Sequence, residues 1–215
     1  MKKKVEINRR LSGQDERNEA RNRIVKSAAQ IFASQGFAGA SIREIALDAD
    51  VTHQLIAYDY GGKEDLWWAA VEAEIDQLIL NYSAVAAKTK NVSPERRFRE
   101  FVRAFVEYEA NSGVLARLML QEALAKSGRY QKLLNHKKLT GADPVTRFLD
   151  DAHDQGILID MPPAELRLNF LSLISHRYMI DLHASLTLGE PVRSASAIKK
   201  HADTIATMFL RSSRS

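Results

Sequence analysis

Apolar residues recur three and four positions apart along nearly every stretch between the glycines and prolines of the chain, which is the spacing of one helix face. Residues 63–88 illustrate the pattern, with Leu66, Ala70 and Ile75 on one stripe. No stretch alternates apolar and polar residues for long enough to predict a strand, and the short apolar run 157–159 is interpreted as a loop. The pattern therefore predicts an all-α fold.

Several helix starts carry local signals. Ser41 and Glu44 have the spacing of a capping box, Thr52 is a plausible N-cap, and Ser93 precedes Pro94 at a first helical position. We expect helices over about 17–34, 42–49, 53–60, 63–88, 93–111, 114–126, 130–139, 145–155, 163–188 and 194–211.

The composition narrows the class of protein. The lack of cysteine excludes a disulfide framework, a thiol nucleophile and thiolate metal ligands, and it suits a reducing cytoplasm. The longest run without Asp, Glu, Lys or Arg, Ser27–Ile42, is too short to span a membrane. The basic start MKKKVEINRRL lacks the apolar stretch of a secretory signal. We expect a cytoplasmic protein with no membrane partner.

Charge is unevenly distributed along the chain. The whole sequence has 31 Lys and Arg against 27 Asp and Glu, a net charge of +4. Residues 1–26 hold nine basic and four acidic side chains, a net +5, whereas residues 41–66 hold two basic and six acidic ones, a net −4. A cationic contribution to binding is therefore expected mainly from the first segment.

Two short predicted helices, 42–49 and 53–60, are joined by Ala49-Asp50-Val51-Thr52 and form a helix-turn-helix candidate. In such a pair the second helix protrudes and fits the major groove of DNA, while the first crosses the backbone. Helix N-termini and nearby cations then hold the phosphates. The alternative is a purely structural helix pair inside an all-α core.

The stretch Ile24–Glu72 resembles the N-terminal domain of the TetR family of transcriptional regulators. The matching positions follow one another in order along this stretch. They are Ala28, Phe32, Gly36-Phe37, Ser41-Ile42-Arg43-Glu44-Ile45-Ala46, Val51-Thr52, Leu55-Ile56, Tyr58, Tyr60 and Lys63-Glu64-Asp65-Leu66. The remaining chain is similar to the family only in length and helical layout.

The resemblance implies a division of the chain into three parts. Residues 1–16 would be a basic flexible arm, 17–66 a three-helix helix-turn-helix domain that binds DNA, and 67–215 a helical ligand-binding and dimerisation domain. The last two predicted helices, 163–188 and 194–211, would pack with those of a second copy. Both are apolar on more than one side, which favours burial against a two-fold partner.

By resemblance the recognition helix is about 53–59. Gln54 could then read adenine and His53 guanine or phosphate, while Tyr58 and Lys63 match positions that clamp phosphates. The predicted contacts with double-stranded DNA are made by Lys2, Lys3, Lys4, Ser41, Arg43, Thr52, His53, Gln54, Tyr58 and Lys63. Arg9 and Arg10 would add to the charge of the arm.

Three residues depart from the family pattern. Asp50 replaces the usual turn glycine, Asp59 stands where a neutral or basic residue is common, and Gly62 replaces a capping serine or asparagine. If position 50 is left-handed, aspartate is among the few tolerated replacements. Together with the acidic balance of 41–66, these residues leave a second interpretation open. The chain would then be a TetR-shaped module that binds a ligand or a protein and has little affinity for DNA.

An effector pocket in such a regulator lies between helices and has a few polar groups in an apolar wall. The candidate ligand-binding side chains combine aromatic, polar and flexible apolar groups of the C-terminal part. They are Tyr82, Tyr108, Arg117, Met119, Gln121, Glu122, His136, Phe170 and His176.

Neither a metal nor an enzymatic reaction is expected. No two of the six histidines have the four-residue spacing of a helical zinc site, and the sequence has no glycine-rich phosphate loop or nucleophile elbow. We therefore predict a sequence-specific, DNA-binding homodimeric repressor without a cofactor. An unidentified small molecule would release it from a near-palindromic operator.

Overall fold

The computed structural model describes residues 2–139 and 144–211. Over these residues the chain forms eleven α-helices and one isolated antiparallel bridge, Leu158 with Leu210. The helices are α1 (Lys2–Gly39), α2 (Ile42–Asp48), α3 (His53–Tyr60), α4 (Lys63–Lys88), α5 (Pro94–Asn111), α6 (Val114–Ala125), α7 (Gly128–Leu134), α8 (Pro144–Asp154), α9 (Pro163–Met179), α10 (Asp181–Leu188) and α11 (Ala195–Phe209). The predicted all-α fold is confirmed.

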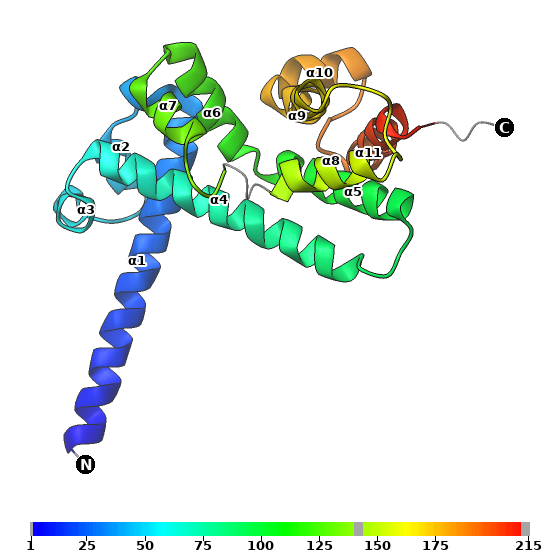
Figure 1. The fold of residues 1–215 in the computed structure, drawn as a ribbon. Coiled ribbons are helices and arrows are strands. Elements are labelled where there is room, and N and C mark those ends of the chain that lie inside the picture. Colours follow the sequence, from blue (N-terminus) through cyan, green and yellow to red (C-terminus); the bar gives the residue numbers. More distant parts are fainter. Residues whose placement is uncertain (1, 140–143, 212–215) are drawn as a thin grey trace.

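The helices form two lobes that share α4 (Figure 1). We call residues 17–66 the head and residues 67–211 the body. In the head, α2 and α3 lie beside the C-terminal half of α1, and α6 and α7 of the body lie next to them. Helices α5 and α8–α11 form the far lobe, while the N-terminal half of α1 projects away from both.

The predicted helix starts are present. Side-chain oxygens of Ser41, Thr52 and Ser93 accept hydrogen bonds from backbone N–H groups in the first turns of α2, α3 and α5, at 3.2–3.3 Å. The reciprocal half of the expected capping box is replaced by another contact, since Glu44 accepts a hydrogen bond of 2.6 Å from Gln35. The sharp boundaries of α2–α5 therefore follow from local sequence.

The first helix is longer than expected. It is continuous from Lys2, whereas the sequence predicted a start near Arg17 after a flexible arm over 1–16. Apart from Gly13 the segment lacks helix breakers, and one internal glycine costs only about 1 kcal/mol relative to alanine. At the other end the chain leaves helical geometry at Gly36, with φ 71°.

The helix expected over 163–188 is in fact two helices, because the chain bends at Ile180 (φ −110°, ψ 39°). No glycine or proline marks this bend. Arg193 holds it from a distant part of the chain, donating to the Tyr178 carbonyl at 3.3 Å and pairing with the Asp181 carboxylate. The single-helix prediction was therefore wrong because a tertiary contact satisfies the end of α9.

Aromatic rings fill the core of the far lobe. Phe170 on α9 is fully buried, and its ring lies 5.4–6.4 Å from those of Phe98, Phe101, Phe105 and Phe209. Burial of such a ring contributes about 1.5–3 kcal/mol through the area removed from water alone. This cluster joins α5, α9 and α11 and forms one wall of the body.

Candidate functional site

A left-handed turn separates α2 from α3. Asp50 has φ 53°, and the N–H groups of Asp50 and Val51 bond to the carbonyls of Leu47 and Ala46. The position that usually needs glycine is thus left-handed here, with aspartate in it. Short side chains that bond locally tolerate this conformation better than most others.

Buried side chains fix the helix pair on α1. Ile45 of α2 and Ile56 of α3 are at most 2% exposed. The Ser27 hydroxyl and the Arg23 guanidinium of α1 donate to the carbonyls of Ile45 and Ala49 at 3.3 and 3.1 Å. Helix α3 is therefore held by its inner face, and its outer face is open.

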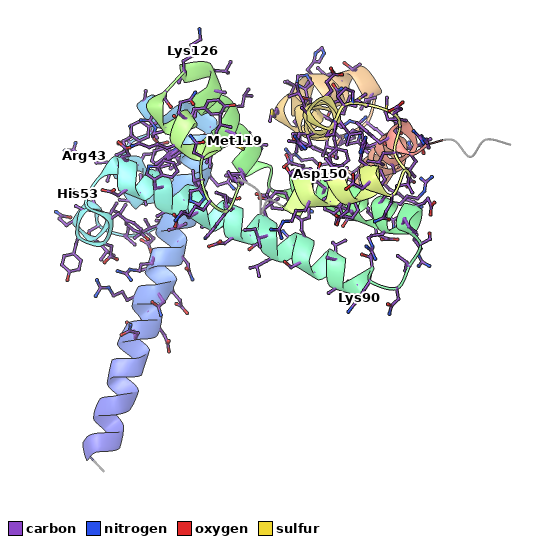
Figure 2. All side chains as sticks on the ribbon, viewed as in Figure 1. Arg43, His53, Lys90, Met119, Lys126 and Asp150 are labelled. Atoms are coloured by element: carbon purple, nitrogen blue, oxygen red, sulfur yellow. The ribbon has the colours of Figure 1, made fainter. Side chains whose placement is uncertain are left out.

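The predicted reading residues lie on this outer face. Thr52, His53, Gln54 and Tyr58 are all exposed, and 77% of Tyr58 is accessible to solvent. Ser41 and Arg43 at the start of α2 are exposed as well, and Figure 2 shows Arg43 and His53 at the same outer edge of the head. The structure brings these six predicted residues together on the exposed side of α2 and α3.

Asp59 is turned inward from this face. Its carboxylate accepts hydrogen bonds from Arg17 at 2.7 Å and from Arg21 at 3.1 and 3.2 Å, and its side chain is 1% exposed. Hydrogen bonds from Arg21 and Arg17 lower the pKa of Asp59 below its ordinary value of 3.8. The Arg17 guanidinium also lies 5.4 Å from the centre of the Tyr58 ring. The negative charge of Asp59, which would repel DNA phosphates, is thus neutralised by two arginines of α1.

Lys63 is used within the protein. Its ammonium donates to the Ala38 carbonyl at 3.3 Å and lies 4.8 Å from the centre of the Phe37 ring. The Arg129 guanidinium of α7 also lies close to this ring, 3.6 Å from its centre. In this structure Lys63 fastens the start of α4 to the end of α1, while its predicted phosphate contact would need another rotamer.

The predicted lysines of the arm lie far from these contacts. Lys2, Lys3 and Lys4 form the first turn of α1, at the end that projects from the molecule (Figure 1). They are therefore separated from the outer face of α3 by the length of the projecting half-helix.

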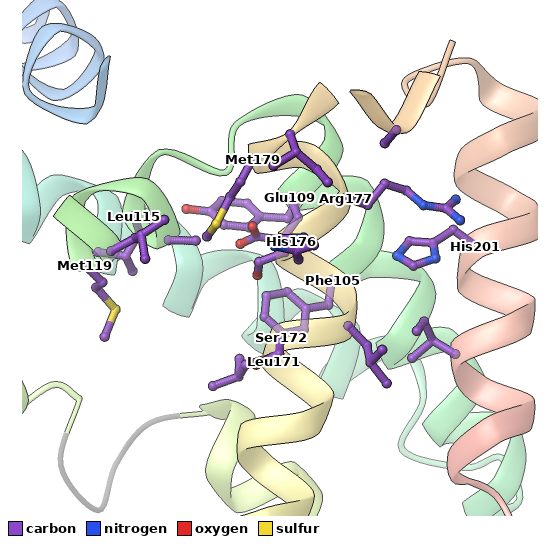
Figure 3. A pocket seen from close by; sticks show the side chains of 18 of the residues that line it. Phe105, Glu109, Leu115, Met119, Leu171, Ser172, His176, Arg177, Met179 and His201 are labelled. Carbon is purple, nitrogen blue, oxygen red and sulfur yellow. The ribbon is translucent and has the colours of Figure 1, made fainter. Parts of the chain in front are cut away.

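The body contains a cavity of about 1010 Å³, lined by α5, α6 and α9–α11 with single residues of α4, α7 and α8. Three of the predicted ligand-binding residues, Tyr108, Met119 and His176, line it. Figure 3 shows Leu115 and Met119 on one side of α9, and Arg177 with His201 on the other.

The other six candidates lie outside its lining, for identifiable reasons. Tyr82 and Phe170 belong to the aromatic core, where the Tyr82 ring packs 4.9 Å from Phe101. Gln121 lies against Gly36 at the joint with the head. The ring of His136 stacks on Trp68 at 6.3 Å, and its Nε2 lies 3.4 Å from Glu72.

The two remaining candidates, Glu122 and Arg117, are charged, and both form hydrogen bonds within the protein. Glu122 is buried and accepts hydrogen bonds from Ser127 and from Arg129, the latter at 3.1 Å. Arg117 is half-buried and donates to the Ser112 carbonyl at 2.9 Å. These residues pack the joints between helices rather than facing the cavity.

Glu109 is a lining residue that the sequence analysis missed. It is 4% exposed, faces the cavity from α5, and its carboxyl bonds to Ser175 of α9. The signal was available, because Glu109 continues the spacing of Phe98, Phe101 and Phe105 along the buried face of its helix.

A polar link joins the cavity to α4. Tyr108, which lines the cavity, and Ser112 both donate to the Glu74 carboxylate at 3.4 Å. Burial raises the pKa of Glu74 above its ordinary value, although both hydroxyls and Arg117 oppose the shift. Because α4 begins at the head, this contact lies on a direct path between the two lobes.

The described residues form neither a metal site nor a membrane-spanning helix. No group of three or more His, Asp or Glu among them is placed to hold a metal ion. None of their helices combines the length and apolar character needed to cross a lipid bilayer.

Comparison with known proteins agrees with the head geometry. The family described as "Bacterial regulatory proteins, tetR family" matches residues 24–70, which include the two short helices and their turn. The helix-turn-helix region of this chain is that of the TetR family. Members of this family are transcriptional regulators with a DNA-binding helix-turn-helix, and they are not enzymes.

Individual relatives agree with this assignment to the TetR family. The chain is 23% identical over 159 residues to the probable HTH-type transcriptional regulator YttP of Bacillus subtilis (strain 168), covering 74% of this chain and 77% of YttP. HlyIIR, a hemolysin II transcriptional regulator, has a TM-score of 0.67 and 19% identity over 91% of this chain and 99% of its own.

AibR, solved with isovaleryl coenzyme A and operator DNA, has a TM-score of 0.65 and 19% identity over 88% of this chain and 97% of its own. At this level of identity the two structures establish the TetR-family fold.

Proposed function

We propose that this chain is a homodimeric, cytoplasmic repressor that binds a near-palindromic operator and is released from it by a small-molecule effector. The exposed N-terminal end of α3 carries the proposal. Thr52, His53 and Gln54 lie free of the core there, on a helix fixed by Ile56 behind it. A helix presented in this way can place its first side chains against base edges in the major groove.

Exposed apolar side chains on α9–α11 support the dimer. Five large apolar residues of this segment are at least 36% exposed but also line the cavity. They are Leu171, Leu173, Ile180, Leu188 and Met208. A further three, Leu168, Leu182 and Leu186, are 68–75% exposed in the single chain and lie outside the cavity lining. A two-fold partner that covers them would place two copies of α3 on one side of the dimer, about 34–36 Å apart for successive major grooves.

The pairing of Asp59 bears on the alternative of a module without DNA affinity. That interpretation rests on the net charge of −4 over residues 41–66. Arg17 and Arg21, which lie outside that window, cancel the charge of Asp59 at its own position. The acidic balance of the segment therefore overstates the repulsion that a phosphate would meet at α3.

The link between the cavity and α4 supports release by an effector. A ligand between α5, α6 and α9 would contact Tyr108, which is bonded to Glu74 of α4. Such coupling typically amounts to about 1–3 kcal/mol and is reciprocal, so operator DNA should weaken effector binding by the same factor. AibR, a protein of similar fold, was solved in complex with both isovaleryl coenzyme A and operator DNA, so a protein of this fold can hold a small molecule as well as DNA.

Selection of bound sequences from a random double-stranded DNA library tests the DNA-binding part directly. We expect an enriched inverted repeat whose half-sites lie about one helical turn apart, or a multiple of it. A His53→Ala/Gln54→Ala variant should bind without enriching the repeat, because phosphate contacts remain and base contacts are lost. Absence of an enriched repeat, or a strictly monomeric wild-type protein, would contradict the proposal.

The salt dependence of binding to the enriched repeat separates the two interpretations. The affinity of a regulator that uses its basic segment should fall steeply with salt, with a slope of about −0.9 for each phosphate contact. Deleting residues 1–10, which contain Lys2–Lys4, Arg9 and Arg10, should flatten the slope and leave the preferred sequence unchanged. An unchanged slope would show that the arm makes no contact with the DNA phosphates.

A further inference from the structure

The charged end of the cavity is formed around Glu109. This residue of α5 is 4% exposed and lines the cavity beside Phe105 and His176 (Figure 3). A hydroxyl of Ser175 bonds to its carboxyl. Apolar side chains, among them Leu115 and Met119, cover the neighbouring wall.

The cations near Glu109 are shared with other acids. Arg117 and Arg193 both act on Glu109, but Arg117 also faces Glu74, and Arg193 is paired with Asp181. Three carboxyl groups therefore share two guanidinium groups. Burial raises the pKa of Glu109 to about 7 in spite of Ser175 and the two arginines. The cluster is one positive charge short when Glu109 is ionised.

Arg177, which also lines the cavity, does not fill this deficit. It lies on the other side of α9, next to His201 of α11 (Figure 3), where burial and the Arg177 charge lower the pKa of that histidine. A ligand carboxylate at Glu109 would add a fourth anion to the cluster. A ligand cation would instead supply the missing charge next to the carboxyl group of a residue that is itself only 4% exposed, where the interaction is stronger than in bulk water.

We propose that the cavity takes an amphipathic cation whose protonated amine binds the Glu109 carboxylate and whose apolar chain lies along Leu115 and Met119. This assignment rests on the proposed function of the cavity as the effector site. It names the chemical class of the effector, an apolar amine, and Glu109 as the residue that sets the preference for it.

Three ligands with the same ten-carbon chain test the head group alone. Decylammonium, 1-decanol and decanoate are titrated calorimetrically into the full-length protein, each below its micelle-forming concentration. At about pH 8, where Glu109 is mostly ionised, decylammonium should bind about tenfold to a hundredfold more tightly than decanol, since bonds to charged groups are the stronger ones. Decanoate should bind most weakly.

Glu109→Gln keeps the shape of the side chain and removes its charge. It should abolish the preference for decylammonium and leave the affinity for decanol within about twofold. Glu107→Gln is the matched control, because it removes the same charge from an exposed position two residues away on α5. It should keep the wild-type preference. Thermal unfolding of both variants checks that they are folded.

A pH series on the wild-type protein supplies a second measurement should Glu109→Gln fail to fold. Decylammonium affinity should rise between about pH 6 and about pH 8 as Glu109 ionises, whereas decanol affinity should not. The groups that face Glu109 are Tyr108, Ser175, His176, Tyr178, Arg117 and Arg193, with Glu74 behind them. The series is repeated on His176→Gln as a control for the neighbouring imidazole.

The outcomes are decisive in each case. Equal affinity for the three head groups, no binding of decylammonium to the wild-type protein, or an unchanged preference in Glu109→Gln overturns the proposal, as does a pH rise that disappears in His176→Gln. Operator selection with the ligand-free protein is independent of all of these. An enriched repeat without a preference for the cation would overturn the ligand class and leave the regulator intact.

Discussion

Asp59 in the head and Glu109 in the body each face two arginines, yet their pKa values shift in opposite directions. Asp59 accepts hydrogen bonds of 2.7–3.2 Å from Arg17 and Arg21, and its pKa is lowered. Glu109 has Arg117 and Arg193 nearby, and burial still raises its pKa to about 7.

The difference lies in the burial of Glu109, which is the larger cause, and in how the arginines are shared. Those of the head donate directly to Asp59, whereas Arg117 donates to the Ser112 carbonyl and Arg193 to Asp181 and to the Tyr178 carbonyl. A count of the arginines near each carboxyl group would not distinguish Asp59 from Glu109, because each has two. The direct bonds from arginine distinguish Asp59, which is stably ionised, from Glu109, whose carboxyl bonds to Ser175 and has no cation of its own.

Removing a ring from the aromatic core of the body should cause the largest loss of stability among these tests. Phe170→Ala removes a fully buried ring that contacts four others, and it should lower the free energy of unfolding by about 3–5 kcal/mol. Urea denaturation followed by circular dichroism measures this loss. The exposed neighbour Asn169→Ala should change it by no more than about 0.5 kcal/mol. If the two variants were equally stable, Phe170 would again be a candidate ligand contact.

The pH dependence of stability should expose the raised pKa of Glu109. A folded-state pKa that is raised from 4.5 to about 7 makes the native state bind a proton more strongly than the unfolded chain. Wild-type stability should therefore fall relative to Glu109→Gln as pH rises through this window, by on the order of 3 kcal/mol above it. Denaturant unfolding at several pH values measures the difference, and a constant difference would contradict the assignment.

Asp59→Asn should change the pH dependence of stability in the opposite direction to Glu109→Gln, and by a smaller amount. Because the pKa of Asp59 is lowered, its contribution is present above pH 3.8 and lost as pH falls through the lower, folded-state value. At neutral pH the variant should bind the selected operator severalfold more weakly, since α3 loses its bonds to α1 although a negative charge is removed. A fluorescence-anisotropy titration measures the affinity. Tighter binding would mean that Asp59 acts by repelling phosphate.

The turn between α3 and α4 offers the smallest test. Gly61 has φ 77° and Gly62 has φ −148°, while an added Cβ would meet only Asp65, at 3.6 and 3.8 Å respectively. Gly61→Ala should therefore cost about 1 kcal/mol through its left-handed backbone. Gly62→Ala should stay within about 0.5 kcal/mol, and thermal unfolding compares the two. Equal losses would point to crowding instead of backbone strain.

The sequence predicted the head well because its signals are local. Caps at Ser41 and Thr52 and the pair Gly61-Gly62 lie next to the boundaries that they determine, so α2–α4 begin where expected. The outward face of α3 followed from the family resemblance.

What the sequence could not predict depends on residues far apart along the chain. The bend at Ile180 is held by Arg193, and Asp59 is paired with arginines 38 and 42 positions earlier. Only three of the nine predicted ligand-binding residues line the cavity, because polar residues such as Glu122 and Arg117 have partners at helix joints.

The contact between Gly36 and Gln121 has a consequence for chimaeric regulators. A Cβ at Gly36 would lie 3.2 Å from the Gln121 side chain, so α1 of the head meets α6 of the body at close range. The head is thus attached at two places, through the continuous α4 and through this packing. If the head of a relative were joined to this body at residue 66, its α1 would pack against an α6 surface that is complementary to the α1 of this chain. A transferable recognition unit must therefore bring the matching surface of α6 with it.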